Sequence, residues 1–588
     1  MKIKNSTLTA VILSIMLSFT ACEKDFLVKS DPGAATVDGF FQTADDFKLG
    51  VNGIYNSLTS AGYFVTFWGG NYFHMNMEFD VISDNMVGQG SAWKGYSEVA
   101  SGLLTPLSGG ITEWKFNYGM GAISKINTML DLIPNIDFGA EGSAIWEAEL
   151  KFIRGFLYAD LAFLYGGMPL ITTAIDASEA DAIGRSTQAE TYAQAISDLQ
   201  FAAANLGTTP NSGEVGRPTT MAATTAIAYA LLNQDDYAGA AAEFAKVIAL
   251  EGGSVGLVPA SQWECLNRGC AEDSVEIIWS IQNGPLSEGS GDFIPMGIPT
   301  QSGYNGWSGH KFTQNMIDAF PMANGLPITD PASGYDAADP YSNRDPRLRM
   351  TFFFEGDPYD GGTIGDAEFG GVCCNGDTRL MANIGIAPVF PKKYTADPDT
   401  TPEAFAQMNT IEYGSPMDIN IYRYSGVLLA HAEALNESGN TAGAYAGVNK
   451  VRNRAGLPDL TAGLSQSEMR DAILHESRIE HALEGRRFYD LKRAGKLMET
   501  VNSNQGWDLH GGANYKAHFD RLLGSKFKGR FVGSLGPKLN RVEAPSKYVV
   551  DFVFSEPSPG WKTIMTLNNL VWWVRPKSYL DANKGKKS

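Results

Sequence analysis

Short helices in consecutive pairs are the feature that most constrains the fold of this 588-residue chain. Segments 187–205, 219–232 and 235–250 carry apolar residues at helical spacing, and the middle segment is rich in alanine. A second set of helices is predicted over residues 422–438, 441–455, 466–483 and 485–500. Between the two sets, residues 251–420 are rich in Gly, Pro, Asp and Asn, which predicts a long loop-rich insertion. The chain is therefore expected to be mainly α-helical.

More helices are expected nearer the N-terminus. Residues 43–46 form a helix-capping signal, and helical spacing starts at Phe47. Segments 112–134 and 141–166 are strongly helical, whereas residues 62–110 are rich in Gly, Trp and Asn and are expected to form loop. The helix pairs resemble tetratricopeptide-like repeats. We therefore expect a tetratricopeptide-like helix-pair scaffold that carries one large insertion.

The first 22 residues predict export. Two lysines precede a mostly apolar run over residues 7–19, which is too short to span a bilayer. Cys22 follows a small residue and resembles the cysteine of a bacterial lipobox, which is acylated and becomes the new N-terminus. The alternative is an ordinary signal peptide followed by a chance cysteine. Residues 1–21 are thus expected to be a lipoprotein signal peptide, and residues 22–45 a lipidated tether and N-terminal arm.

Acidic residues dominate the charge of the chain. It has 65 Asp and Glu against 46 Lys and Arg, which gives a net charge of −19. Loss of Lys2 and Lys4 with the signal peptide would take the net charge to −21. Such a surface repels nucleic acid and anionic lipid headgroups. It favours neutral, polar ligands over anionic ones, unless a local basic patch is present.

Four cysteines remain besides the one in the lipobox-like segment: Cys265, Cys270, Cys373 and Cys374. An exported protein can keep disulfides. Adjacent cysteines pair with each other only under strain, so cross-links from Cys373 and Cys374 to the other two are predicted. The rival interpretation is a four-cysteine zinc site. An adjacent Cys-Cys pair is a poor match to the usual CxxC spacing, so no metal is expected.

An ordered series of motifs resembles the SusD/RagB family of outer-membrane lipoproteins from Bacteroidetes. The motifs are YGGMPL at 165–170, NRDPRL at 343–348, LLAHAEALNE at 428–437, VNKVRNRAGLP at 448–458, ESRIE at 476–480 and EGRRFYDLKR at 484–493. Their order and spacing carry the resemblance, which covers nearly the whole mature chain. Residues 520–588 depart from it, and no role is assigned to Trp572 and Trp573.

This resemblance implies a SusD-like protein that is lipid-anchored in the outer membrane and faces the cell exterior. It implies capture of an oligosaccharide or polysaccharide and delivery to a SusC-like TonB-dependent transporter, without catalysis and without a cofactor. A peptide-binding importer component on the same scaffold is the alternative. The single body over 46–588 would then contain an N-terminal helical part (46–250), a ligand-binding insertion (251–420), a C-terminal helical part (421–500) and a mixed C-terminal region (501–588).

A surface glycoside hydrolase is a third hypothesis, without positive support in the sequence. Hydrolysis of a glycoside needs two carboxylates held across the sugar, and no spacing singles out such a pair. No GxSxG or HExxH motif is present. Asp330, Asp336 and Asp339 lie in an oxygen-rich loop, where acidic turns are favoured over a calcium site.

A dense cluster of charged residues over 476–493 is interpreted as structural. Acidic and basic residues alternate there at three- and four-residue spacing, which favours ion pairs along packed helices. Arg344, Asp345 and Arg347 are expected to hold the insertion to the scaffold in the same way.

Aromatic residues in polar loops are the candidates for sugar binding. Pyranose rings stack on aromatic rings, and their hydroxyls need polar partners. The candidates are Trp93, Tyr304 and Trp307 for stacking, Asp84, Asn85 and Asn305 for hydrogen bonding, and Trp68 in a weaker third region. The alternative is that these aromatics fill local hydrophobic pockets. Trp114, Trp146 and Trp279 lie in periodic or strand-like runs and are expected to pack in the core.

Overall fold

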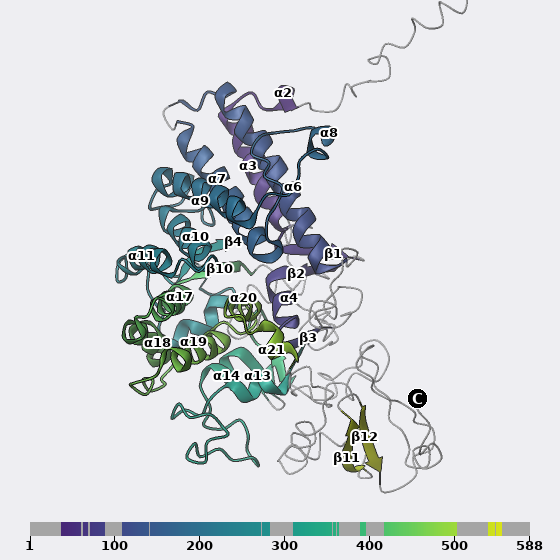
Figure 1. Cartoon of the computed structure of the whole chain (residues 1–588), viewed down its shortest axis with the longest axis vertical. Helices are drawn as coiled ribbons and strands as arrows, with labels where there is room; N and C mark the ends of the chain where they lie inside the picture. Colours follow the sequence, from purple (N-terminus) through teal and green to yellow (C-terminus); the bar gives the residue numbers. More distant parts are fainter. Residues whose placement is uncertain are drawn as a thin grey trace, which may run out of the picture.

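Paired helices form the scaffold of the protein, shown here as a computed structural model (Figure 1). The structure describes residues 37–59, 63–68, 71–88, 109–139, 142–271, 273–282, 310–354, 357–359, 362–363, 389–395, 417–502, 539–546 and 549–554. The scaffold helices are α3 (Ala44–Thr59), α6 (Ile111–Leu132), α7 (Ala144–Tyr165), α9 (Gln188–Asn205), α10 (Thr220–Leu232), α11 (Tyr237–Ile248), α17 (Tyr424–Glu437), α18 (Thr441–Arg454) and α19 (Gln466–Glu480). The predicted mainly α-helical fold is confirmed. No helix in these ranges is both long and apolar enough to cross a bilayer.

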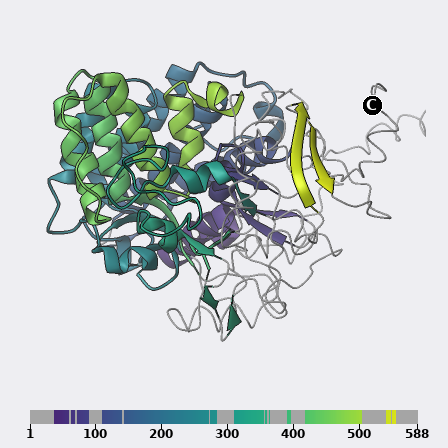
Figure 2. The ribbon, with the colours of Figure 1, turned by 90° about the horizontal axis from the view of Figure 1, so that it is seen from below.

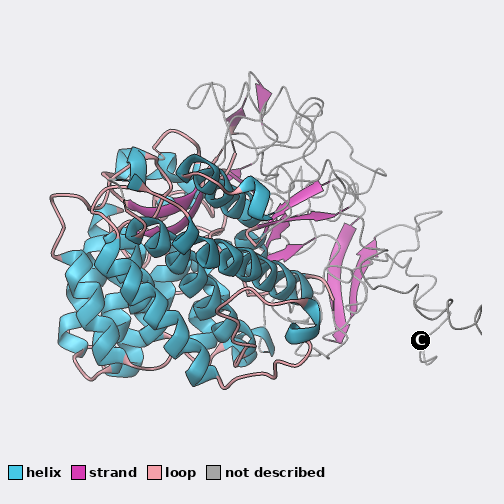
Figure 3. Cartoon of the chain, turned by 90° about the horizontal axis from the view of Figure 1, so that it is seen from above, coloured by secondary structure: helices cyan, strands magenta, loops and turns pink. Residues whose placement is uncertain are grey.

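The helical series continues across the long insertion. Helix α9 packs against α7 and α10, α10 against α11, and α11 against α17, which in turn contacts α18 and α19. Residues 249–423 are therefore inserted between two helices that are neighbours in space. Near the two ends of this insertion, β4 (Ile277–Ile281) and β10 (Ile419–Arg423) pair as antiparallel strands. Figure 3 shows the helices gathered on one side of the molecule and most of the strands on the other.

Side-chain caps fix the starts of several helices. At α3, Thr43 Oγ1 accepts from the Asp46 amide at 3.2 Å, and Asp46 Oδ2 accepts from the Thr43 amide at 2.9 Å. Thr187 and Ser465 form the same reciprocal box at the starts of α9 and α19. The box satisfies amide groups that have no partner inside the helix. The capping signal at residues 43–46 is thus confirmed.

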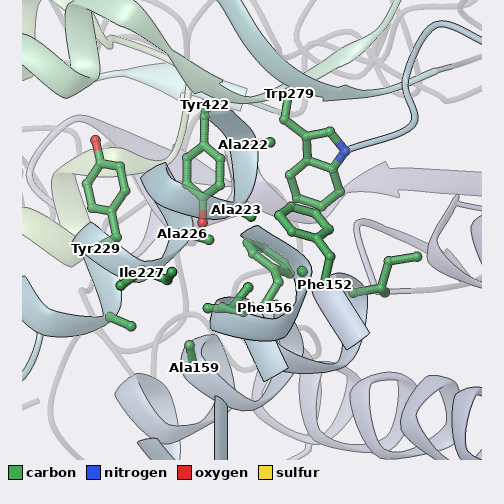
Figure 4. Packing of buried hydrophobic residues seen from close by; sticks show 14 of the residues in the cluster. Phe152, Phe156, Ala159, Ala222, Ala223, Ala226, Ile227, Tyr229, Trp279 and Tyr422 are labelled. Atoms are coloured by element: carbon green, nitrogen blue, oxygen red, sulfur yellow. The ribbon is translucent and has the colours of Figure 1, made fainter. Parts of the chain in front are cut away.

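The main core lies where α7 and α10 meet the β4–β10 pair (Figure 4). Trp279 of β4 packs edge-on against Phe152 and Phe156 of α7, with ring centroids 4.8 and 5.1 Å apart. Alanines of α10 lie opposite these rings and leave room for them. Trp146 and Trp279 are buried, as predicted, and Trp114 is half-buried against a second core cluster.

Two sequence-based expectations about secondary structure are wrong. Residues 62–110 do not form loop throughout, because β1 (Val65–Trp68), β2 (Asn71–His74), α4 (Met75–Val81) and β3 (Met86–Gly88) lie within them. Elements this short show too few repeats for a periodic signal. The helix expected over 485–500 is divided into α20 (Arg486–Arg493) and α21 (Leu497–Asn502), with Gly495 in the left-handed region at φ 66° between them.

The remaining elements are short and lie mostly in or beside the insertion. They are α2 (Val37–Phe40), η2 (Ile133–Asn135), α8 (Ala177–Ala180), η4 (Asn211–Gly213), α12 (Ala260–Trp263), η5 (Glu264–Asn267), β5 (His310–Phe312), α13 (Gln314–Ala319), α14 (Arg347–Thr351), β6 (Phe352–Phe354), β7 (Pro358–Tyr359), β8 (Gly362–Thr363), β9 (Val389–Pro391), β11 (Leu539–Ser546) and β12 (Val549–Phe554). Strand β6 pairs with β9, β7 with β8, and β11 with β12. Figure 2 shows the β11–β12 pair on the side of the molecule away from α17, α18 and α19.

The cysteine pairing differs from the prediction. Cys265 and Cys270 are bonded to each other, with their Cα atoms 4.9 Å apart. The turn through η5 brings the two residues together, so the predicted cross-links from Cys373 and Cys374 to this pair are wrong. Cys373 and Cys374 themselves lie outside the described residues.

Candidate functional site

A small antiparallel ladder joins the two regions predicted to bind ligand. Strand β3 pairs with β5, so that Met86 faces Phe312 and Gly88 faces His310. The chain leaves β3 toward residue 93 and enters β5 from residue 307. Gly88 and His310, more than 200 residues apart in sequence, therefore stand at the same end of one ladder. We call this pair of strands the β3–β5 ladder.

Asp84 anchors the turn that leads into the ladder. Its carboxylate accepts two hydrogen bonds from Arg487, at 2.8 and 3.0 Å, and lies 3.1 Å from Arg478 Nη2. The side chain of Asp84 is only 5% exposed. Burial alone would raise the pKa of Asp84, but Arg478 and Arg487 outweigh it and hold the pKa well below its usual range. The charged side chain of Asp84 therefore links the turn before β3 to the C-terminal helices α19 and α20.

Asn85 extends the same anchor. Its side-chain Oδ1 accepts from Arg478 Nε at 2.8 Å, and its Nδ2 donates to Asp80 Oδ1 at 2.9 Å. Asp80 also accepts from the backbone amide of Gly485 at 3.1 Å. Burial raises the pKa of Asp80 to about 7, against the lowering effect of these hydrogen bonds. Asp80 is thus a buried carboxyl group that titrates near neutral pH.

Thr313 locks the other strand of the ladder to this turn. Its backbone amide donates to Asn85 O at 2.9 Å, and its hydroxyl donates to Asp84 O at 2.7 Å. The same hydroxyl accepts from the Met316 amide at 3.1 Å, which caps α13. One buried threonine therefore fixes both the end of β5 and the start of the next helix.

A buried network of ion pairs lies among the insertion and the C-terminal helices. Arg347 of α14 contacts Glu476 at 2.7 Å and Glu480 at 3.1 Å, and it pairs with Asp345 at 2.8 Å. All four side chains are at most 2% exposed. Arg347 thus holds the insertion to α19. This confirms the expectation for Arg347 and its partner Asp345, whereas Arg344 donates to backbone carbonyls within the insertion, those of Ile317, Phe320 and Pro340.

A second buried arginine extends the network to the strands. Arg423 of β10 contacts Glu276 at 2.7 Å, Glu480 at 3.2 Å and Glu484 at 2.8 Å. Lys393 Nζ also lies 2.8 Å from Glu484. Burial opposes ionisation of Glu484, but Arg423 and Lys393 keep its pKa below the usual range.

The interpretation of the 476–493 cluster as ion pairs is confirmed, with one difference. Most pairs run between elements rather than along one helix, as in the contacts of Arg423. Arg493 and Asp490, at 2.7 Å, are an exception at i,i+3 spacing. The carboxylates of this cluster are therefore held in place by fixed cations, which does not suit proton transfer in catalysis.

The predicted ligand residues fall into three groups. Asp84 and Asn85 are described, and we correct their assignment: as whole residues both are at most 4% exposed, and their polar atoms bind protein groups rather than facing solvent. Trp68 ends β1, where its backbone pairs with Asn71 of β2. Trp93, Tyr304, Asn305 and Trp307 lie outside the described residues, as does Cys22.

Sequence reasoning missed the partners that position this site. Arg478 and Arg487 belong to the charged cluster that the sequence indicated, but nothing in the sequence pairs them with Asp84, about 400 residues earlier. Thr313 is the N-cap of α13, and threonine is a residue type that favours this position. Its contact with Asp84 depends on tertiary structure alone.

The aspartates of the 330–339 loop form turns. Asp330 Oδ1 accepts from the Ala332 amide, and Asp336 Oδ1 from the Ala338 amide, both at 2.8 Å. Such bonds are typical of acidic turn residues. In the part of the chain that the structure describes, no three His, Cys, Asp or Glu side chains are grouped so that they could hold a metal ion.

Comparison with known families gives two matches. The sequence profile of the SusD family matches residues 275–525. A second profile, described as "Starch-binding associating with outer membrane", matches residues 69–232. Together the two matched ranges cover more than half of the chain. The start of the insertion lies between them.

Individual relatives are similar over most of their length. A SusD-like protein of Formosa agariphila is 25% identical over 528 residues, which is 86% of this chain and 94% of that protein. A SusD-like carbohydrate-binding protein of Bacteroides fragilis superimposes with a TM-score of 0.66 at 22% identity, over 78% of this chain and 88% of the other. Surface glycan-binding protein A of Bacteroides thetaiotaomicron, in complex with laminarihexaose, gives a TM-score of 0.59 at 18% identity, over 79% and 92% of the two chains. At these identities, the solved structures show a shared fold.

Proposed function

Because this chain belongs to the SusD/RagB family, we propose that it captures a glycan at the cell surface and passes it to a TonB-dependent outer-membrane transporter. In this proposal Cys22 carries the lipid that holds the protein in the outer membrane, facing the cell exterior. The ligand is an oligosaccharide or polysaccharide. The protein binds it without catalysis, through aromatic stacking and hydrogen bonds.

The pairing in the β3–β5 ladder is the observation that carries this proposal. Trp93 follows Gly88 by five residues, and Trp307 precedes His310 by three. An extended chain spans at most about 3.6 Å per residue, so five residues reach about 18 Å and three about 11 Å. One bound oligosaccharide is long enough to contact both regions. We therefore propose Trp93, Tyr304, Asn305 and Trp307 as ligand residues, with Trp68 as a weaker addition.

The ion pairs of Asp84 beside the ladder favour a binding role over a catalytic one. Asp84 joins the turn before β3 to Arg478 and Arg487, and its pKa is held low. A carboxylate fixed between two guanidinium groups is a poor general acid or base. It does hold the ladder rigidly, which lowers the entropy lost when a ligand orders the loops.

The first experiment measures retention of the purified protein in native gels that contain a polysaccharide. Laminarin is the first probe, because a protein of the same fold is seen with laminarihexaose. Starch and xylan serve as other neutral polymers, and alginate as an anionic one. We expect retention by a neutral polymer and none by alginate, because the net charge of the chain is −19.

Variants then test the residues. The double variant Trp93→Ala, Trp307→Ala should lose retention, because stacking on a sugar ring is removed at both ends of the proposed site. Phe40→Ala is the matched control, since Phe40 is an aromatic residue with 41% of its surface exposed on α2. Retention equal to that of the unchanged protein in the double variant would refute these residues. Binding of a peptide pool but of no glycan would favour a peptide importer, and release of reducing sugar would favour a hydrolase.

The lipid at Cys22 and the transporter partner need separate measurements. Replacement of Cys22 by Ser should move the protein from the outer-membrane fraction to the soluble fraction, because acylation needs the thiol. Affinity purification of the unchanged protein from cells should recover a TonB-dependent transporter. A Cys22→Ser protein that stays in the membrane fraction would argue against lipid anchoring.

A further inference from the structure

A cavity of about 120 Å³ lies at the junction of α7, α10, β10 and α20. These elements do not form the β3–β5 ladder, so the cavity is separate from the site proposed above. Its lining includes Tyr229, Tyr422 and Tyr489 together with Asp160 and Arg486. Asp160, Arg486 and Tyr489 are only partly buried, so the cavity opens toward the surface on that side.

Small side chains beside the tyrosines leave the space open. Ala159 of α7 and Ala226 of α10 line the cavity together with Tyr229 and Tyr422, and Figure 4 shows Ala226 near the hydroxyl end of Tyr422. The two rings stack at 5.4 Å with 7° between their planes, and Figure 4 shows their hydroxyl groups pointing in opposite directions. The part of the wall that these four residues form is therefore apolar and aromatic, which suits the face of a ring-shaped ligand, whereas charged side chains line the rest.

The hydroxyl of Tyr422 has no partner. Tyr422 is 93% buried, and among the residues that the structure describes no hydrogen bond to its Oη is found. Figure 4 shows this hydroxyl directed from β10 toward Ala226. By contrast, Tyr229 Oη accepts from Arg486 Nη1 at 2.8 Å, and the Tyr489 hydroxyl donates to Asp160. This oxygen is not among the fully enclosed polar atoms, so it faces the cavity, where a water or a ligand can supply its hydrogen bond.

The charged groups of the cavity already have protein partners. Asp160 Oδ2 lies 3.8 Å from Lys115 Nζ and also accepts from the hydroxyl of Tyr63. Asp490 pairs with Arg493 at 2.7 Å, so that both charges are compensated. An ionised ligand would bring an uncompensated charge into a half-buried space, which is unfavourable. The cavity therefore suits a neutral molecule.

The size of the cavity limits the ligand to a single ring. One buried water needs roughly 10–15 Å³ of such volume, so the cavity holds several waters or one small solute. A chain of sugars would not fit. We propose that this cavity is a second binding site, which takes one neutral, hydroxylated ring of monosaccharide size and satisfies the hydroxyl of Tyr422. This site goes beyond the proposed capture of a longer glycan at the β3–β5 ladder.

The test uses saturation-transfer NMR on the full mature protein with D-glucose, D-galactose, D-mannose and N-acetyl-D-glucosamine, followed by titration of each ligand that gives a signal. D-glucuronate is the charged comparison. We expect at least one neutral sugar to bind and D-glucuronate not to. No signal from any of the four neutral sugars would mean that the cavity holds only water, and would overturn the inference.

Variants locate the binding. Tyr422→Phe removes only the hydroxyl, and it should weaken binding about 5- to 10-fold through the loss of one hydrogen bond. Tyr192→Phe is the matched control, because Tyr192 is also buried and its hydroxyl has no partner, but it lies on α9 outside the cavity lining. Ala226→Leu fills the cavity and should abolish binding. If Ala226→Leu does not fold, the comparison of Tyr422→Phe with Tyr192→Phe still tests whether the sugar binds in the cavity, because only Tyr422→Phe should weaken binding.

One further variant separates the two sites. The double variant Trp93→Ala, Trp307→Ala should bind the monosaccharide as the unchanged protein does. If it loses the monosaccharide, the sugar occupies the loop site and this inference is overturned, while the proposed function stands. If Tyr422→Phe and Ala226→Leu bind unchanged, the cavity is not the site. Loss of polysaccharide retention with monosaccharide binding intact would instead contradict the proposed function alone.

Discussion

The helical scaffold and the β3–β5 ladder are held together by different forces. In the scaffold, consecutive helices bury apolar residues such as Leu157 and Phe244, which are fully buried. At the ladder, the anchoring contacts are charged and long-range, as between Asp84 and Arg487. Apolar packing tolerates substitution if volume and pattern are kept. A buried charge tolerates little, because removing one partner leaves the other without compensation. The β3–β5 ladder is thus fixed more specifically than the scaffold.

The largest effect is expected from breaking the buried ion network. Glu480 contacts Arg347, Arg423 and Arg454, at 3.1, 3.2 and 2.6 Å. Glu480→Ala should lower the free energy of unfolding by about 3–5 kcal/mol, since three buried guanidinium groups lose a common partner. Urea denaturation followed by circular dichroism measures this. A loss below 1 kcal/mol would mean that the network contributes little to the fold.

A smaller loss of stability, with a larger loss of function, is expected at the anchor of the ladder. Asp84→Asn removes the charge between Arg478 and Arg487 but keeps one hydrogen-bond acceptor, so the cost is about 2–3 kcal/mol. Retention by polysaccharide should fall, because the strands lose their fixed position. Leu157→Ala, in the scaffold, is the control: it should cost about 2–5 kcal/mol and leave retention per folded molecule unchanged. Equal retention in both variants would remove the distinction between the two regions.

The next effect depends on pH. The pKa of Asp80 is about 7 in the folded protein because of burial, whereas an unfolded chain gives about 3.9. The folded state therefore favours the protonated form, and this stabilisation is complete below about pH 4 and is lost as the pH rises through 7. Asp80→Asn is neutral at every pH. The free energy of unfolding of the unchanged protein minus that of Asp80→Asn should fall by about 2–3 kcal/mol between pH 5 and pH 9. A difference that does not change with pH would show that Asp80 is ionised throughout.

The smallest effect is expected at Thr313. Thr313→Val removes a hydroxyl that both caps α13 and donates to Asp84 O. The expected cost is about 1–2 kcal/mol. Thr313→Ser keeps the hydroxyl and should recover most of the loss. Thermal unfolding of the three proteins in parallel tests this, and equal midpoints for Val and Ser would rule out a role for the hydroxyl.

The regions also differ in how far the sequence predicted them. The scaffold helices follow from apolar spacing, and the capping box at Thr43 marks the start of one of them. The structural role of the 476–493 cluster was predicted as well. The ladder was not, because its strands are three residues long and their partners lie more than 200 residues apart. Asp84 and Asn85 fit a ligand site in the sequence for the same reason: a polar segment gives no sign of the arginines that cover it after folding.

The sequence by itself determined the mainly helical fold, the acidic charge and the family. These properties depend on composition, on motif order and on spacings of three or four residues, all of which are local to the chain. Only the tertiary structure decided which arginine meets which carboxylate, that Cys265 pairs with Cys270, and that β3 and β5 meet. Such choices depend on where distant segments lie after folding. The type of a charged or polar residue does not identify its partner. A partner becomes necessary only when folding buries the residue away from water.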